Sequence, residues 1–181
     1  MQVNLNTLEV RVADFEIAVK KVLKLEGVSF EDMETGEITK YGISLKLIKG
    51  LADAGRETYG IEPTVEGIRG LTKPQAKKVY RGVFWDEMKL DGVKEQEVAD
   101  KIMDAGVNMG PQIPVRIAQR VAGVDVDGIV GPKTLKAINK MKGKEFLVQY
   151  RQGLEDRYRG LAANRLVLKK YLDGWIARTR S

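Results

Sequence analysis

The chain has 181 residues, with 31 basic and 25 acidic side chains and neither cysteine nor histidine. This composition excludes a disulfide scaffold, zinc held by cysteine or histidine, a cysteine nucleophile and any catalytic triad with a histidine base. A net charge of +6 favours an anionic partner, such as nucleic acid, a membrane surface or an acidic cell-wall polymer.

The first segment, residues 1–15, lacks an apolar run long enough for the core of a signal peptide. No later segment is long and apolar enough to span a bilayer. We therefore expect a soluble protein that accumulates in the cytoplasm, does not insert into a membrane, and needs another agent to release it.

A helix is predicted after Asp14, a suitable N-cap. Side chains at helical spacing then follow on one stripe: Phe15, Val19, Val22 and Glu26. Gly27 stands where a helix end favours a left-handed residue. Glu26 therefore lies in the last turn, on the side that faces the core, where an unpaired carboxylate is costly.

Residues 28–39 lose the helical period, and a turn signal at Thr35-Gly36 predicts a short hairpin. This segment is rich in carboxylates. The helical pattern resumes at Ile43, and Thr72 with Pro74 marks the start of a further helix. The remaining helices are predicted over 93–106, from Pro114 to Gly123, from Pro132, over 144–162 and over 165–178. The fold class is thus mainly α, with one small β-hairpin after the first helix.

Glu26 has two interpretations. A carboxyl among apolar groups favours its protonated form and can act as the general acid that glycosidic bond cleavage needs, with a second group in the nearby hairpin to manage water. Alternatively, Glu26 only caps the helix end and the hairpin is a solvated acidic turn. Pattern alone favours this second interpretation.

Two other groups of polar residues each have both a functional and a structural interpretation. Asp104 and Asn108 share a helix face if the helix continues that far, but Asn108 is also suited to cap the helix end. Asp125 and Asp127 alternate as in a calcium loop, yet Lys136 occupies the position where such a loop needs a glutamate. We interpret the segment as a turn before Pro132, and expect neither metal nor organic cofactor.

Several ordered motifs resemble glycoside hydrolase family 108, the N-acetylmuramidases of phage and prophage lysins and bacterial secretion activators. The family's Glu-Gly-Gly-Tyr is similar to Glu26-Gly27, and its Gly-Gly-x-Thr-x-Tyr-Gly-Ile to GEITKYGIS at 36–44. LTKPQAKKVYRGVFWDEM at 71–88 and DAGVNMGP at 104–111 resemble further family segments. Residues 118–139 and 158–178 resemble the predicted peptidoglycan-binding domain that accompanies the family, so the likeness covers about residues 12–178.

The resemblance implies a lysozyme-like fold and cleavage of the β-1,4 bond between N-acetylmuramic acid and N-acetylglucosamine in peptidoglycan. Glu26 matches the family's catalytic glutamate, and Thr39 matches its loop threonine, which could hold the attacking water. The loop departs from the family: Gly-Gly-Tyr is Gly27-Val28-Ser29, and the loop aspartate has no unambiguous counterpart. Counting back from Thr39 places Glu34 there, with Asp32 and Glu37 as alternatives.

The saccharide-binding candidates are Tyr41, Trp85, Asp104 and Asn108, because aromatic faces and amide dipoles suit acetylated sugars. Packing in the core is an equally good interpretation of Trp85. We divide the chain into a catalytic part at 1–88 and a helical, peptidoglycan-binding-like part at 89–181, packed as one globule.

The resulting hypothesis is a peptidoglycan hydrolase, such as a phage or prophage endolysin. We expect a monomer that acts in the periplasm or on the cell wall after holin-assisted release or host lysis. The alternatives are a catalytically silent wall-binding or regulatory protein and a lytic transglycosylase. A nucleic-acid partner is not expected, because no dominant basic stripe accompanies the positive charge.

Overall fold

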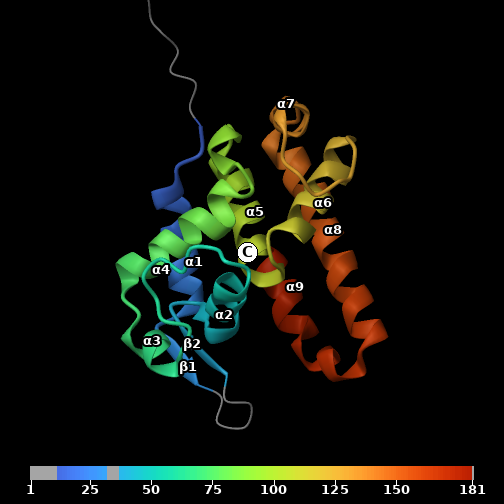
Figure 1. Cartoon of the computed structure of the whole chain (residues 1–181). Coiled ribbons are helices and arrows are strands. Elements are labelled where there is room, and N and C mark those ends of the chain that lie inside the picture. The colour runs from blue at the N-terminus through green and yellow to red at the C-terminus, as the bar shows by residue number, and fades with distance from the viewer. Residues whose placement is uncertain (1–11, 32–36, 181) are drawn as a thin grey trace, which may run out of the picture.

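The computed structural model describes residues 12–31 and 37–180, and every structural statement below refers to these residues. Most of them are helical, and a small antiparallel sheet follows the first helix, as predicted (Figure 1). In chain order the elements are α1 (Phe15–Glu26), β1 (Ser29–Glu31), β2 (Ile38–Lys40), β3 (Ile43–Ser44), α2 (Leu45–Asp53), α3 (Val65–Gly70), α4 (Lys73–Val79), the π-helix η1 (Tyr80–Asp86), the 3₁₀ turn η2 (Leu90–Gly92), α5 (Gln96–Met109), α6 (Gln112–Ala122), α7 (Pro132–Lys140), α8 (Gly143–Asn164), the 3₁₀ segment η3 (Leu166–Tyr171) and α9 (Leu172–Arg180).

The first helix has the predicted boundaries. The carboxylate of Asp14 accepts a hydrogen bond from the backbone N–H of Glu16 at 2.7 Å, which satisfies one of the free donors of the first turn. The helix ends at Glu26, and Gly27 follows with φ of +70°, a conformation that glycine adopts without strain. The buried stripe of α1 therefore delivers Glu26 to the helix end.

The sheet extends beyond the predicted hairpin. Strand β2 pairs antiparallel with β1 and also with β3, so that Thr39 lies opposite both Phe30 and Ser44. The expected helix at Ile43 is wrong by two residues, because Ile43 and Ser44 continue the sheet before the Ser44 hydroxyl caps α2. The predicted turn at Thr35-Gly36 lies outside the described residues.

A tight turn at Tyr41-Gly42 joins β2 to β3 and packs on the end of α1. Both residues have positive φ, +49° and +76°. The Tyr80 hydroxyl donates a hydrogen bond to the Tyr41 carbonyl at 2.8 Å. A Cβ at Gly42 would lie 2.2 Å from the Tyr80 hydroxyl oxygen and 2.7 Å from Cγ of Glu26. Only glycine therefore lets the sheet approach Glu26 this closely.

The later helices follow the predicted order, with shifted ends. Thr72 forms a capping box with Gln75, and Gly123 ends α6 in the left-handed conformation, both as predicted at these helix ends. α5 runs to Met109, beyond the predicted end at 106, and is closed by Gly110. The predicted last helix is divided into the 3₁₀ segment η3 and α9.

The elements are arranged on two sides of α5. The sheet and α1–α4 lie on one side, α6–α9 lie on the other, and the C-terminus returns to the middle of the molecule (Figure 1). One hydrophobic core extends across both sides, from Ala13 to Ile176. Among the described residues, no helix is long and apolar enough to cross a membrane.

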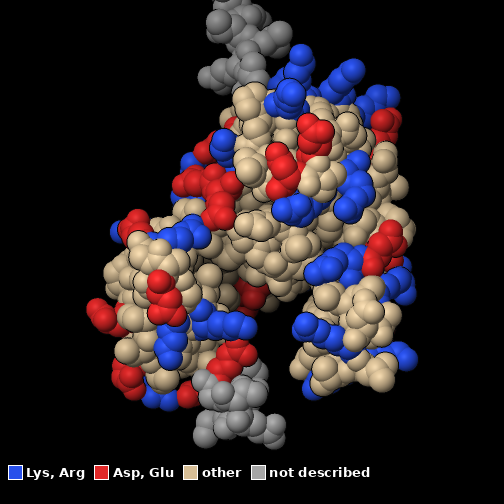
Figure 2. Space-filling model, turned by 45° about the vertical axis from the view of Figure 1, so that its right-hand side comes forward, with Lys and Arg blue, Asp and Glu red and all other residues tan. Residues whose placement is uncertain are grey.

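A deep hollow, here called the cleft, separates the sheet side from the end of the α8–η3–α9 side (Figure 2). An acidic side chain lies at the inner end of the cleft, and basic side chains lie along the side that α8 and α9 form (Figure 2). The cleft therefore lies between the two halves of the chain rather than within either one.

We expect Gly42→Ala to lower the free energy of unfolding by about 2 kcal/mol or more, because a Cβ adds steric overlap with Tyr80 and Glu26 to the cost of positive φ. Gly27→Ala is the matched control, since Gly27 also has positive φ but no atom within 4 Å of the added Cβ. It should cost about 1 kcal/mol. Urea unfolding followed by circular dichroism measures both, and equal losses would contradict the tight contact at Gly42.

Candidate functional site

Glu26 occupies the end of α1, beside the Tyr41-Gly42 turn, with its side chain 19% exposed. Its Oε1 accepts a hydrogen bond from Nη2 of Arg178 at 2.6 Å, across 152 residues of sequence. The ion pair fixes the direction of the carboxylate, since a guanidinium holds its partners in a planar, rigid arrangement. Glu26 is therefore oriented by the last helix of the chain.

Arg178 bridges two carboxylates. Besides Glu26, it contacts Oδ1 of Asp104 through Nε at 2.9 Å and through Nη2 at 2.8 Å. Burial by itself lowers the pKa of Arg178, but attraction to Asp104 and Glu26 outweighs burial, and the net shift of the pKa is upward. The guanidinium therefore stays charged and joins α1, α5 and α9 at one point.

Lys101 holds the C-terminal end of α9 through the backbone carbonyl of Arg178. Its side chain is buried, and its Nζ donates a hydrogen bond to the carbonyl of Arg178 at 3.0 Å. Burial lowers the pKa of Lys101, and the nearby charge of Asp104 partly opposes that shift. A cation at the last carbonyls of a helix is favourable, so Lys101 holds the backbone from which Arg178 reaches Glu26.

Tyr80 supports the other side of Glu26. Burial, together with the negative charge of Glu26, raises the pKa of Tyr80, so that its hydroxyl keeps its proton. That proton is donated to the Tyr41 carbonyl. Tyr80 thus connects the π-helix η1 to the turn that packs against Glu26.

The predicted loop residues are only partly covered by the structure. Thr39 lies in the middle of β2 and is half-buried, and Glu37 is exposed just before this strand. Glu34 and Asp32 lie outside the described residues. The roles of all four remain predictions.

The four predicted saccharide contacts have different positions. Tyr41 is half-buried in the turn, and Asn108 is exposed within the last turn of α5, where its amide donates to the Tyr158 hydroxyl rather than capping the helix. Asp104 is almost fully buried and engaged with Arg178. Trp85 has 0% exposure, and its Nε1 donates a hydrogen bond to Asp91. Its ring therefore has no free face for a sugar, and Trp85 is a core residue rather than a saccharide contact.

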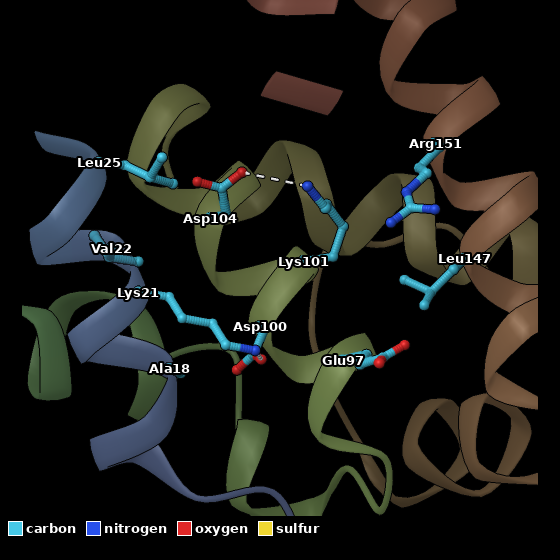
Figure 3. Close-up of a pocket in the computed structure, with 10 residues that line it drawn as sticks. All are labelled: Ala18, Lys21, Val22, Leu25, Glu97, Asp100, Lys101, Asp104, Leu147 and Arg151. Carbon is cyan, nitrogen blue, oxygen red and sulfur yellow. Dashed lines mark hydrogen bonds and ion pairs between the residues drawn. The ribbon is translucent and has the colours of Figure 1, made fainter. Parts of the chain in front are cut away.

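A separate cavity of about 280 Å³ lies between α1, α5 and α8 (Figure 3). Its charged lining residues are three basic and three acidic: Lys21, Lys101, Arg151, Glu97, Asp100 and Asp104. Lys21 pairs with Asp100 at 2.5 Å, and Lys101 lies 3.8 Å from Asp104. Glu26 does not line this cavity, although Asp104, the second partner of Arg178, does. The formal charges of the lining cancel and favour neither anions nor cations.

The arrangement around Glu26 can bind and polarise a ligand but offers no cation cage. In the described part of the chain, no group of three or more acidic residues is placed to hold a metal ion. The segment at Asp127, interpreted above as a turn, is held by hydrogen bonds between nearby residues. The Asp127 carboxylate accepts from the Ile129 N–H and the Gln119 amide, and these bonds lower the pKa of Asp127. The chemistry available at Glu26 is that of an oriented carboxyl group with a guanidinium beside it.

Sequence reasoning missed Arg178 and Tyr80. One signal was available for Arg178: it follows Trp175 at helical spacing in a short last helix that also carries the apolar residue Ile176. A charged residue at such a position needs a buried partner. The identity of that partner, 152 residues away, is not encoded in any local pattern.

Comparisons with known proteins show which families the sequence matches and which solved structure has a similar fold. The family model of glycosyl hydrolase 108 matches residues 19–110, and the model of the Predicted Peptidoglycan domain matches residues 113–180. The chain is similar to the solved structure of SagA from Brucella abortus, with 27% identity and a TM-score of 0.76. The match covers 92% of this chain and 89% of SagA. A search of curated proteins finds no match.

We expect Arg178→Met to lower the free energy of unfolding by about 2–3 kcal/mol, because Glu26 loses its cation and Asp104 retains only Lys101, at 3.8 Å. This loss is smaller than the usual loss of about 3–5 kcal/mol for a broken buried pair, since the three side chains are still 13–22% exposed. Urea unfolding near neutral pH measures the loss.

Arg180→Met is the matched control on the same helix, because the Arg180 side chain is 65% exposed and its partner Glu155 also pairs with Arg159. Its effect should be much smaller than that of Arg178→Met. Similar losses for the two variants would show that the charge cluster at Glu26 does not stabilise the fold.

Proposed function

Because the chain belongs to the glycosyl hydrolase 108 family and is thus a glycoside hydrolase, we propose that it cleaves the β-1,4 bond between N-acetylmuramic acid and N-acetylglucosamine in peptidoglycan, with Glu26 as the general acid. The match of residues 113–180 to the Predicted Peptidoglycan domain supports this choice of polymer. The net charge of +6 also suits an anionic cell wall.

The position of Glu26 carries the proposal. A general acid has to be fixed within reach of the leaving oxygen, yet remain accessible to the sugar. Glu26 meets both needs, since Arg178 orients its carboxylate and 19% of its side chain stays exposed. No other glutamate in the described residues combines a helix end, the sheet turn and a buried cation.

Arg178 holds Glu26 in position for this role, because its Nη2 donates a hydrogen bond to Oε1 at 2.6 Å. A general acid must carry a proton when it acts on the bound sugar. Asp104 holds the guanidinium in place, because Arg178 contacts it through two nitrogens. Asp104 is thus a positioning residue rather than a saccharide contact.

The second group of the reaction comes from the loop before β2. Glu34 is the proposed base or water-orienting carboxylate, with Asp32 and Glu37 as alternatives, and Thr39 on β2 is the proposed holder of the water. Tyr41, in the turn between β2 and β3, and Asn108, in the last turn of α5, are the remaining candidates for sugar contacts. Glu34→Gln, Asp32→Asn and Glu37→Gln, tested one at a time, separate the three carboxylates.

The Arg178–Glu26 ion pair and the altered loop also favour a second candidate, a wall-binding protein that does not cut. Glu26 would then only contribute to binding. A lytic transglycosylase uses the same acid without a bound water and leaves anhydromuramic ends. The products of digestion distinguish all three.

We expect wild-type protein to release fragments with reducing N-acetylmuramic acid ends from peptidoglycan, and Glu26→Gln to lose at least about a hundredfold in rate, because an amide cannot donate the proton. Mass spectrometry of the soluble products measures both. Glu66→Gln is the control, since Glu66 lies on α3 with its side chain 80% exposed.

Full activity of a folded Glu26→Gln protein would refute the assignment of the acid. Anhydromuramic ends would identify the transglycosylase instead. Binding to insoluble peptidoglycan without any soluble product would favour the silent wall-binding protein.

A further inference from the structure

Two aromatic residues precede Arg178 along the last segment of the chain. Trp175 lies on α9, three positions before Arg178, and Tyr171 is the last residue of η3. Because Arg178 reaches Glu26, α9 is anchored beside the Glu26 carboxylate. The two rings therefore extend away from the Glu26 carboxylate along the last segment of the chain.

The aromatic residues form a continuous row that begins at the charge cluster. Tyr158 on α8 is buried, accepts a hydrogen bond from Asn108, and is close enough to Arg178 and Asp104 to feel their charges. Its ring stacks on Trp175 at 5.0 Å and 23°, and Trp175 meets Tyr171 at 5.9 Å and 30°. We call Tyr158, Trp175 and Tyr171 the aromatic row.

Exposure increases outward along the row. Tyr158 is 5% exposed, Trp175 is half-buried, and Tyr171 is 48% exposed. Leu166 and Val167, in the same segment η3 as Tyr171, are also 78% and 70% exposed, and a contiguous exposed apolar patch is typical of a binding surface.

The charges around the outer end suit an anionic glycan. Nζ of Lys170 lies 4.9 Å from the centroid of Tyr171, and Lys169 and Arg165 are exposed on the same segment. Basic side chains line this side of the cleft (Figure 2). The C–H groups of a pyranose ring are attracted to the electron-rich face of an aromatic ring, while the carboxylates of a peptidoglycan strand pair with the lysines.

We propose that Trp175 and Tyr171 bind sugar residues of the peptidoglycan strand beyond the bond next to Glu26. The region matched as a Predicted Peptidoglycan domain then holds the strand as the far wall of the catalytic cleft, rather than as a separate module. This inference rests on the proposed function for the identity of the polymer.

The two tryptophans make the row directly observable. Trp85 has 0% exposure, whereas Trp175 is half-buried at the row, so a ligand on α9 changes the fluorescence of Trp175 alone. Binding is measured in the Glu26→Gln background, so that the strand is not cut. The probes are soluble uncross-linked peptidoglycan strands and, for comparison, a tetrasaccharide of the same repeat.

We expect the long strands to change the emission, and Tyr171→Ala to weaken their binding about tenfold, because one exposed aromatic contact is lost. Tyr171→Phe keeps the ring and should retain the affinity. The tetrasaccharide should bind both variants equally, since it does not reach Tyr171. Val148→Ala is the control, because Val148 is exposed on α8 and is not part of the row.

The outcomes separate this inference from the proposed function. If wild type cuts peptidoglycan but Tyr171→Ala binds long strands as tightly as its parent, the row has no role and the hydrolase stands. If the row binds strands while wild type releases nothing, the row stands and the hydrolase falls. If Tyr171→Ala weakens the binding of strands and of the tetrasaccharide equally, the substitution has a structural effect. If binding to anionic vesicles depends on Tyr171 and strands do not bind, the patch is a membrane-binding surface. Either result overturns the inference.

Discussion

The contact of Arg178 with Glu26 and Asp104 connects the two ends of the chain at one point. It joins the last residue of the first helix, the central helix α5 and the last helix, and each of the three side chains is largely removed from water. Buried charges are tolerated only when paired, so none of the three helices can shift without exposing an unpaired charge to an apolar surrounding. The position of α9, and with it the shape of the cleft, follows from this constraint.

The charge cluster also determines how the two matched regions relate. Glu26 and Asp104 lie within residues 19–110, and Arg178 lies within residues 113–180. The hydrophobic core is likewise shared, from Ala13 to Ile176. The two regions are therefore parts of one structure, in which the second supplies the cation that orients the carboxylate of the first.

Glu26 is held by groups from separate parts of the chain. The guanidinium of Arg178 contacts its carboxylate at 2.6 Å, and the Gly42 backbone packs against its side chain. Because Arg178 also contacts Asp104, α1, α5 and α9 all contribute to the orientation of this carboxylate.

The sequence by itself determined the features that depend on neighbouring residues. The cap at Asp14, the helix end at Glu26, the capping box at Thr72 and the stop at Gly123 were predictable, because each is a hydrogen bond or a backbone conformation within one turn. The family motifs also pointed to Glu26. The partner of Glu26, the burial of Trp85, the third strand at Ile43 and the aromatic row were decided only by the tertiary structure. Each depends on groups brought together from distant segments, and periodicity along a chain carries no record of which distant face a side chain will meet.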